Sequence, residues 1–205
     1  MSTTTYSSNN VLNAVAAAAK VLDERKEEVN RLNVFPVPDG DTGTNMSLTI
    51  QSVVSNVANL PIGALGADIR KAITTGALMG ARGNSGVITS QILRGLCEGS
   101  QSFDEFDVES IAASFDRARE VAFQAVRKPV EGTILTVLRD SAAAAKVAVE
   151  QELSIPEALD AIVAEAYASV QRTPDLLPVL KEHGVVDAGG FGLAILFDAF
   201  TAALL

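Results

Sequence analysis

Apolar residues recur along this chain at intervals of three and four, which is the period of one face of an α-helix. The segment with Val11, Val15 and Leu22 is an example, and such segments are separated by short stretches rich in glycine, proline and asparagine. No segment alternates with the period of two that marks a half-buried strand. We therefore predict an all-α fold of about eight helices. The first expected helix is capped by Asn9 or Asn10 and reaches residue 32 with a break near 23. The others cover 42–57, 67–79, 87–96, 108–126, a segment that opens at 131–137, 155–171, a short helix capped at 173–175, and a last helix with apolar residues over 193–205.

The two ends of the sequence indicate how the chain is organised into domains. Residues 1–8 are uncharged, and we expect a flexible tail followed by a single domain over 9–205. The last apolar helix ends at Leu205 without a cap or a polar tail, although helix ends usually satisfy their final carbonyl groups. We expect these residues to be one part of a longer, multidomain chain.

Composition narrows the range of functions. Apolar residues make up 48% of the chain, but no run reaches the roughly 18 apolar residues of a membrane span, and no signal-peptide pattern opens the sequence. We therefore expect a cytoplasmic protein. A net charge of −9 disfavours nucleic acid as a partner and means that a nucleotide would need metal ions and helix N-termini to hold its phosphates. The single cysteine, Cys97, lies in an apolar pattern and is expected in the core.

The stretch 33–45 carries the most chemistry. Asp39 and Asp41 flank a glycine there, just before a helix that starts at Thr42. Two carboxylates one residue apart suit Mg²⁺, and the N–H groups of the helix start would face the same place. An EF-hand is excluded, because the position of its final glutamate is Ile50. From the residues alone, a turn that merely caps the helix remains the alternative.

A second glycine-rich stretch, 80–86, leads directly into an apolar helix. Its Gly83, Asn84, Ser85 and Gly86 form the kind of turn that cradles phosphate at a helix N-terminus. It is not a Walker A loop, because the sequence contains no Gly-Lys dipeptide. An ordinary Ser or Asn N-cap is the alternative that the residues leave open.

Two further helix starts carry polar residues. Thr133 follows Gly132 and reads as a capping threonine, and Asp187 precedes a run of small residues where it would cap the last helix. The only histidine, His183, excludes a three-histidine zinc site and is explained by a helix end before Gly184.

Two motifs carry a resemblance to a known family. The stretch 32–46, Leu-Asn-Val-Phe-Pro-Val-Pro-Asp-Gly-Asp-Thr-Gly-Thr-Asn-Met, and the stretch 80–86, Gly-Ala-Arg-Gly-Asn-Ser-Gly, resemble the nucleotide-binding domain of the bacterial fatty acid kinase A subunit, a relative of the dihydroxyacetone kinase L subunit. The resemblance covers nearly the whole chain. It implies an antiparallel helical barrel with an ATP site at one end, where loops at 33–45, 80–86, 131–133 and 187–190 converge.

The resemblance also implies roles for single residues, with ATP and Mg²⁺, two ions, as cofactors. Where the wider family has a third Asp, this chain has Asn33, one residue out of step, which offers a carbonyl oxygen but no charge. The implied set is Asp39, Asp41 and Asn33 for metal; Thr42, Gly43, Thr44, Asn45, Gly83, Asn84, Ser85 and Gly86 for the phosphates; Arg82 for the transition state; and Thr133, Asp187 and Gly189 for the nucleoside.

The implied activity is transfer of a phosphoryl group from ATP to a fatty acid carboxylate. The fatty acid would be held by a separate lipid-binding protein and converted to acyl phosphate, and the protein would form a homodimer through domains outside this chain. A carboxylate acceptor needs no general base, and the sequence indicates none. Two alternatives stay open, namely the nucleotide subunit of a dihydroxyacetone kinase and a regulatory module that senses nucleotide without turnover.

Overall fold

The computed structural model describes residues 6–100 and 106–205, and these residues are helical without any strand. The prediction of an all-α fold is therefore confirmed. The helices are α1 (Ser8–Arg31), α2 (Thr42–Ala58), α3 (Gly66–Gly80), α4 (Gly83–Gly99), α5 (Val108–Ala125), α6 (Ile134–Glu150), α7 (Ile155–Leu176), the short α8 (Pro178–His183) and α9 (Ala188–Leu204).

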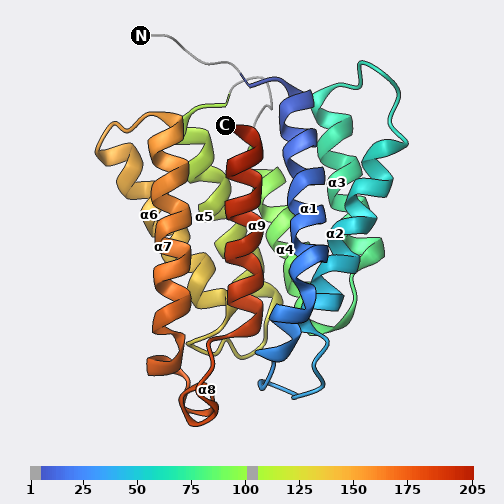
Figure 1. Cartoon of the computed structure of the whole chain (residues 1–205). Helices are drawn as coiled ribbons and strands as arrows, with labels where there is room; N and C mark the ends of the chain where they lie inside the picture. Colours follow the sequence, from blue (N-terminus) through green and yellow to red (C-terminus); the bar gives the residue numbers. More distant parts are fainter. Residues whose placement is uncertain (1–5, 101–105) are drawn as a thin grey trace.

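The eight long helices form a closed antiparallel barrel (Figure 1). Each helix from α1 to α7 packs against the next along the chain, α7 packs against α9, and α9 closes the ring against α1. Since neighbours run in opposite directions, α2, α4, α6 and α9 all begin at the same end, which is the lower end in Figure 1. The loop between α1 and α2 and the short α8 lie at that end too.

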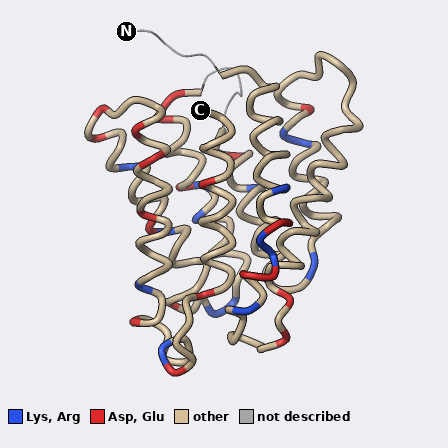
Figure 2. The backbone as a smooth tube through the Cα atoms, viewed as in Figure 1, with Lys and Arg blue, Asp and Glu red and all other residues tan. Residues whose placement is uncertain are grey.

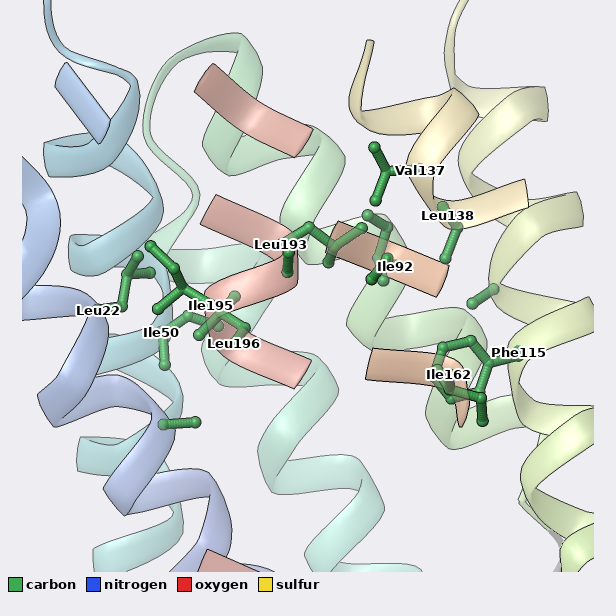
Figure 3. Close-up of a cluster of buried hydrophobic side chains, with 14 of the residues drawn as sticks. Leu22, Ile50, Ile92, Phe115, Val137, Leu138, Ile162, Leu193, Ile195 and Leu196 are labelled. Carbon is green, nitrogen blue, oxygen red and sulfur yellow. The ribbon is translucent and has the colours of Figure 1, made fainter. Parts of the chain in front are cut away.

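The interior of the barrel is apolar. Leu22, Ile92, Leu138, Ile162 and Leu193 come from five different helices and are almost fully buried around the barrel axis (Figure 3). Full burial of one such side chain stabilises the fold by roughly 1.5–3 kcal/mol. The last helix, α9, contacts α1, α2, α6 and α7, which explains why its sequence is apolar nearly all round.

An apolar cavity of about 190 Å³ lies inside the barrel, toward the end where α1 begins and α9 ends. Leu96, Ile111, Phe115 and Phe200 are among its lining residues. Cys97 also lines this cavity and is buried, and burial raises the pKa of its thiol to about 11. The expectation that Cys97 belongs to the core is confirmed.

Charged residues are distributed along the helices. Figure 2 shows Lys and Arg interspersed with Asp and Glu along the tube, and several of them pair within or between helices, such as Arg117 with Glu98 at 2.8 Å. Among the described residues, no helix is long and apolar enough to cross a membrane.

The N-terminal boundary differs from the prediction. Residues 1–5 of the expected tail lie outside the described residues, but Tyr6 is buried and its ring packs edge-on against Phe106. Ser7, rather than Asn9 or Asn10, caps α1, because its side chain exchanges hydrogen bonds with Asn10 in a capping box. The predicted break near residue 23 is absent, and α1 is continuous from Ser8 to Arg31.

The predicted boundary at 173–175 is wrong, because α7 continues through Pro174 to Leu176. Proline lacks the N–H group that would bond to the Val170 carbonyl. The Thr173 hydroxyl donates to that oxygen instead, at 2.6 Å. A single side chain thus satisfies the carbonyl that the proline leaves without its helical partner. The helix α4 also begins earlier than predicted, at Gly83, whereas α9 begins at Ala188, directly after Asp187.

Close packing of α4 against α5 yields a testable prediction at Gly95. A Cβ atom there would lie 2.4 Å from the Ala118 Cα, which belongs to the backbone of α5. Replacing glycine by alanine in a helix gains up to about 1 kcal/mol, but overpacking costs about 1–3 kcal/mol. We expect Gly95→Ala to lower the free energy of unfolding in urea by about 1–2 kcal/mol.

The matched control for this substitution is Gly189→Ala, whose Cβ would first meet an atom at 3.4 Å. It should leave the free energy of unfolding unchanged or raise it slightly. Equal effects at both positions would contradict the packing described for α4 and α5.

Candidate functional site

A cleft of about 590 Å³ opens at the end of the barrel where α2, α4, α6 and α9 begin. It brings together residues that are far apart in the sequence. Those predicted for the site that line it are Asn33, Asp39, Asp41, Thr42, Asn45, Gly83, Asn84, Ser85, Thr133, Asp187 and Gly189.

The loop between α1 and α2 forms one wall of the cleft. Asn33 is buried beneath it, and its side-chain amide is bonded to the loop backbone at two points. Its Oδ1 accepts from the Asp41 N–H at 3.2 Å, and its Nδ2 donates to the Val37 carbonyl at 3.0 Å. The structure therefore gives Asn33 the role of a brace, which holds the loop that carries Asp39 and Asp41.

The two carboxylates of the loop fit the needs of Mg²⁺. Asp39 and Asp41 are exposed and line the cleft. Asp41 occupies the N-cap position of α2, but its side chain makes no capping hydrogen bond, so the capping-turn alternative is wrong for Asp41. The described residues contain no group of three or more His, Cys, Asp or Glu that could hold a metal. Two carboxylates leave most of an octahedral shell to water and phosphate oxygens, which is how proteins usually bind Mg²⁺.

The start of α4 offers uncommitted N–H groups to the cleft. Arg82 is the N-cap residue and provides no side-chain cap, so the alternative of a Ser or Asn N-cap is wrong. Gly83 has a φ of +61°, and its backbone lies against Asn45 of α2, where a Cβ would come within 2.5 Å of the Asn45 Nδ2. The N–H groups of residues 83–85 therefore have no acceptor within their helix, and the helix dipole adds positive potential at the same place.

Asp187 joins the starts of α6 and α9, which form another wall of the cleft. It is buried, caps α9 by accepting from the Gly190 N–H at 2.8 Å, and also accepts from the Ile134 N–H at the start of α6. Its own N–H donates to the Thr173 hydroxyl of α7 at 3.0 Å. The capping role predicted for Asp187 is confirmed. Burial raises the pKa of its carboxyl to about 6, and the hydrogen bonds from the backbone act against that rise.

Thr133 lies at the start of α6 and lines the cleft. It is the N-cap residue, but its hydroxyl does not cap the helix. The hydroxyl donates instead to the Val130 carbonyl at 2.7 Å, which fixes the turn before α6.

Four predicted residues do not line the cleft, namely Gly43, Thr44, Arg82 and Gly86. Gly43 lets α2 approach α1, since a Cβ there would lie 2.2 Å from the Lys26 carbonyl oxygen. Gly86 lets α4 approach α2, since its Cβ would lie 2.6 Å from the Thr49 hydroxyl. The expectation that the Thr44 amide binds phosphate is wrong, because this N–H is bonded to the Asn30 Oδ1 at 3.1 Å. Arg82 is exposed beside the cleft rather than within it.

Two residues of this region were missed by the sequence analysis. Lys128 lines the cleft and lies in the connection between α5 and α6. The signal for Lys128 in the sequence was its place next to the loop residue Pro129 in a chain with a net charge of −9. Asn30 was not noticeable, because its partner Thr44 lies on the next helix.

Comparison with known proteins identifies relatives of the chain. The sequence profile of the DAK2 domain matches residues 36–202. Protein YloV of Bacillus subtilis is 45% identical over 204 residues, which are all but one of this chain and 37% of YloV. An uncharacterized protein of Staphylococcus haemolyticus is 47% identical over 193 residues, or 93% of this chain and 34% of that protein. The chain thus spans little more than a third of these relatives.

Solved structures share the fold. The dihydroxyacetone kinase from C. freundii, crystallised with AMP-PNP and Mg²⁺, superposes with a TM-score of 0.69 at 20% identity, over 98% of this chain and 36% of that chain. Its native form gives a TM-score of 0.62 at 18% identity. At this identity the likeness concerns the fold, and it agrees with the predicted helical barrel.

The buried carboxyl of Asp187 predicts a pH dependence of stability. Its folded-state pKa of about 6 lies above the ordinary value of 3.8, so folding favours the protonated form. The stability is therefore greatest below pH 4 for this group and falls as the pH rises from about 4 to 6, by roughly 2–3 kcal/mol. Asp187→Asn stays neutral and should lack this loss.

The measurement is urea unfolding of both proteins at a series of pH values. All other acidic groups are shared, so the difference between the two curves isolates Asp187. We expect the variant to gain stability relative to the wild type between pH 4 and 6, whereas parallel curves would contradict the buried, ionising carboxyl.

Proposed function

This chain belongs to the DAK2 domain family, and from this membership we propose that it binds Mg²⁺-ATP in the cleft and takes part in phosphoryl transfer. One observation supports the proposal most directly. Four helices begin around one cleft of about 590 Å³. The carboxylates of Asp39 and Asp41 line this cleft, and Asp41 makes no capping hydrogen bond. Helix N-termini attract phosphate, and carboxylates attract the metal that accompanies it.

Asp39 and Asp41 are the proposed metal ligands. When bound, Mg²⁺ would neutralise charge on the phosphate oxygens and orient them for in-line transfer. Asn33 enters the proposal as the brace of this loop rather than as a ligand, because its Oδ1 already accepts the Asp41 N–H. We propose two ions at this loop, as the motif resemblance implies.

The start of α4 is the proposed phosphate cradle. The N–H groups of Gly83, Asn84 and Ser85 would bond to the β- and γ-phosphate oxygens, with Thr42 and Asn45 lining the same side of the cleft. Gly86 contributes by allowing α4 to approach α2. Charge that develops on the transferring group would meet fixed dipoles, which need no reorganisation during the reaction.

Cationic side chains stand near this cradle. Lys128 lines the cleft, and Arg82 is an exposed residue at the N-cap of α4. We propose Lys128 as a phosphate contact, and Arg82 as a rim residue that engages after nucleotide binds.

The wall opposite the acidic loop is the proposed nucleoside side. Thr133 and Gly189 line it, together with apolar residues such as Val130. Asp187 fixes the starts of α6 and α9 beneath them, so we assign it to holding the shape of this wall. An apolar wall with a few polar groups is typical of a nucleoside pocket.

For the acceptor we propose the carboxylate of a fatty acid that a separate lipid-binding protein presents, with acyl phosphate as the product. The motif resemblance to fatty acid kinase A subunits supports this choice. A carboxylate acceptor needs no general base, because it is already ionised at neutral pH. We further propose that domains outside this chain form a homodimer and help to engage the carrier.

A second candidate acceptor is dihydroxyacetone bound to a partner subunit. It is favoured by the fold, which is shared with a dihydroxyacetone kinase over nearly the whole chain. Both candidates use the same nucleotide cleft and differ only in what a partner places at its mouth.

The acceptor is tested with the full-length natural protein, Mg²⁺ and ATP. We expect hydroxylamine-trappable acyl phosphate with a carrier loaded with fatty acid, and no phosphorylation of dihydroxyacetone bound to a kinase K subunit. Transfer to dihydroxyacetone alone would favour the second candidate. Nucleotide binding without transfer to either acceptor would instead indicate a regulatory module.

The metal ligands are tested by Asp39→Ala and Asp41→Ala. Each should abolish phosphoryl transfer and Mg²⁺-dependent nucleotide binding, because each removes a metal ligand. The free energy of unfolding should move by less than about 0.5 kcal/mol, since both side chains are exposed.

The matched control is Asp68→Ala, which removes an exposed carboxylate in the first turn of α3 and should leave transfer intact. Full activity in both loop variants would refute the metal assignment.

A further inference from the structure

We propose that Asn30 is a positioning residue, which caps α2 from the neighbouring helix and thereby keeps the Asp41 carboxylate free to bind metal. This inference rests on the proposed metal role of Asp41. It concerns a residue of α1 that lies outside both motifs.

The contact between Asn30 and the start of α2 replaces the usual cap. The Asn30 Oδ1 accepts from the Thr44 N–H at 3.1 Å, and its Nδ2 donates to the Thr44 hydroxyl at 2.9 Å. Thr44 is the third residue of α2, and its N–H is the one that an N-cap side chain ordinarily bonds. That donor is therefore already occupied, and Asp41 makes no capping bond.

Aspartate is among the preferred N-cap residues, so a free carboxylate at this position would ordinarily turn back onto its own helix. The positive end of the helix dipole attracts it in the same direction. Metal would then have to displace this internal bond before it could bind. By occupying the Thr44 N–H, a neutral amide from α1 removes the competing interaction without adding charge.

The surroundings hold Asn30 in place for this role. Gly43 lets the first turn of α2 sit directly on α1, where its Cβ would lie 3.0 Å from the Asn30 Oδ1. The Asn30 carbonyl accepts from the Asn33 N–H at 3.2 Å, so the same residue also anchors the brace of the loop. The two asparagines near the C-terminal end of α1 together hold the backbone on both sides of the acidic pair.

The test is a calorimetric titration of the full-length natural protein with Mg²⁺ in the presence of AMP-PNP. We expect Asn30→Ala to raise the Kd for Mg²⁺ by about tenfold, because Asp41 then competes for the freed Thr44 N–H. Asn30→Asp keeps an acceptor for that N–H and should bind Mg²⁺ at least as tightly as the wild type. If Asn30→Ala does not fold, Asn30→Ser, whose side chain is shorter, takes its place.

The control is Ser47→Ala, which removes another hydrogen bond between α1 and α2, from the Ser47 hydroxyl to the Asp23 carboxylate at 3.0 Å. It should leave the Kd for Mg²⁺ unchanged. A tenfold loss in this control as well would overturn the inference, because any loosening of the helix pair would then suffice.

A second readout needs neither metal nor activity. Without Mg²⁺, Asp41→Ala should leave the urea midpoint of the wild type unchanged, because Asp41 caps nothing there. In the Asn30→Ala background the same substitution should lower the midpoint, since Asp41 has become the cap. Equal effects in both backgrounds would overturn the inference and leave the proposed function standing, whereas a wild type that binds no Mg²⁺ would overturn both.

Discussion

The first turn of an α-helix leaves N–H groups without partners, and this fold places four such turns around one cleft. An antiparallel barrel with eight long helices necessarily starts every second helix at the same end. One donor at α6 and one at α9 are satisfied by Asp187, and one at α2 is satisfied by Asn30. Those at the start of α4 are not satisfied by any side chain. The unsatisfied donors are what an acidic protein needs in order to attract a polyanion.

Caps supplied by neighbouring helices connect the fold to the site. Asp187 links α6, α7 and α9, and Asn30 links α1 to α2, so these bonds join neighbouring helices at the end of the barrel where the cleft lies. Burial of a carboxylate is unfavourable, and the raised pKa of Asp187 reflects this cost. At this position the one buried carboxyl accepts hydrogen bonds from the starts of two helices, which offset part of that cost.

The sequence predicted the helices well, because a period of 3.6 residues is a local property. It failed where one residue acts on another far along the chain or replaces a missing bond, as Thr173 does for Pro174. The loops of the site could be predicted from their glycines and carboxylates. Most of the predicted site residues do line the cleft. The exceptions depend on contacts between helices, since Gly43 and Gly86 serve helix packing and the partner of Thr44 is on another helix. Barrel closure came only from the family resemblance.

We propose that the acidic loop and the start of α4 together hold Mg²⁺ and a nucleoside triphosphate. A crystal structure of the protein with Mg²⁺ and AMP-PNP tests it most directly. We expect metal bonded to both Asp39 and Asp41, with phosphate oxygens within hydrogen-bond distance of the N–H groups of residues 83–85. A triphosphate bound elsewhere, or metal held without either carboxylate, would contradict it.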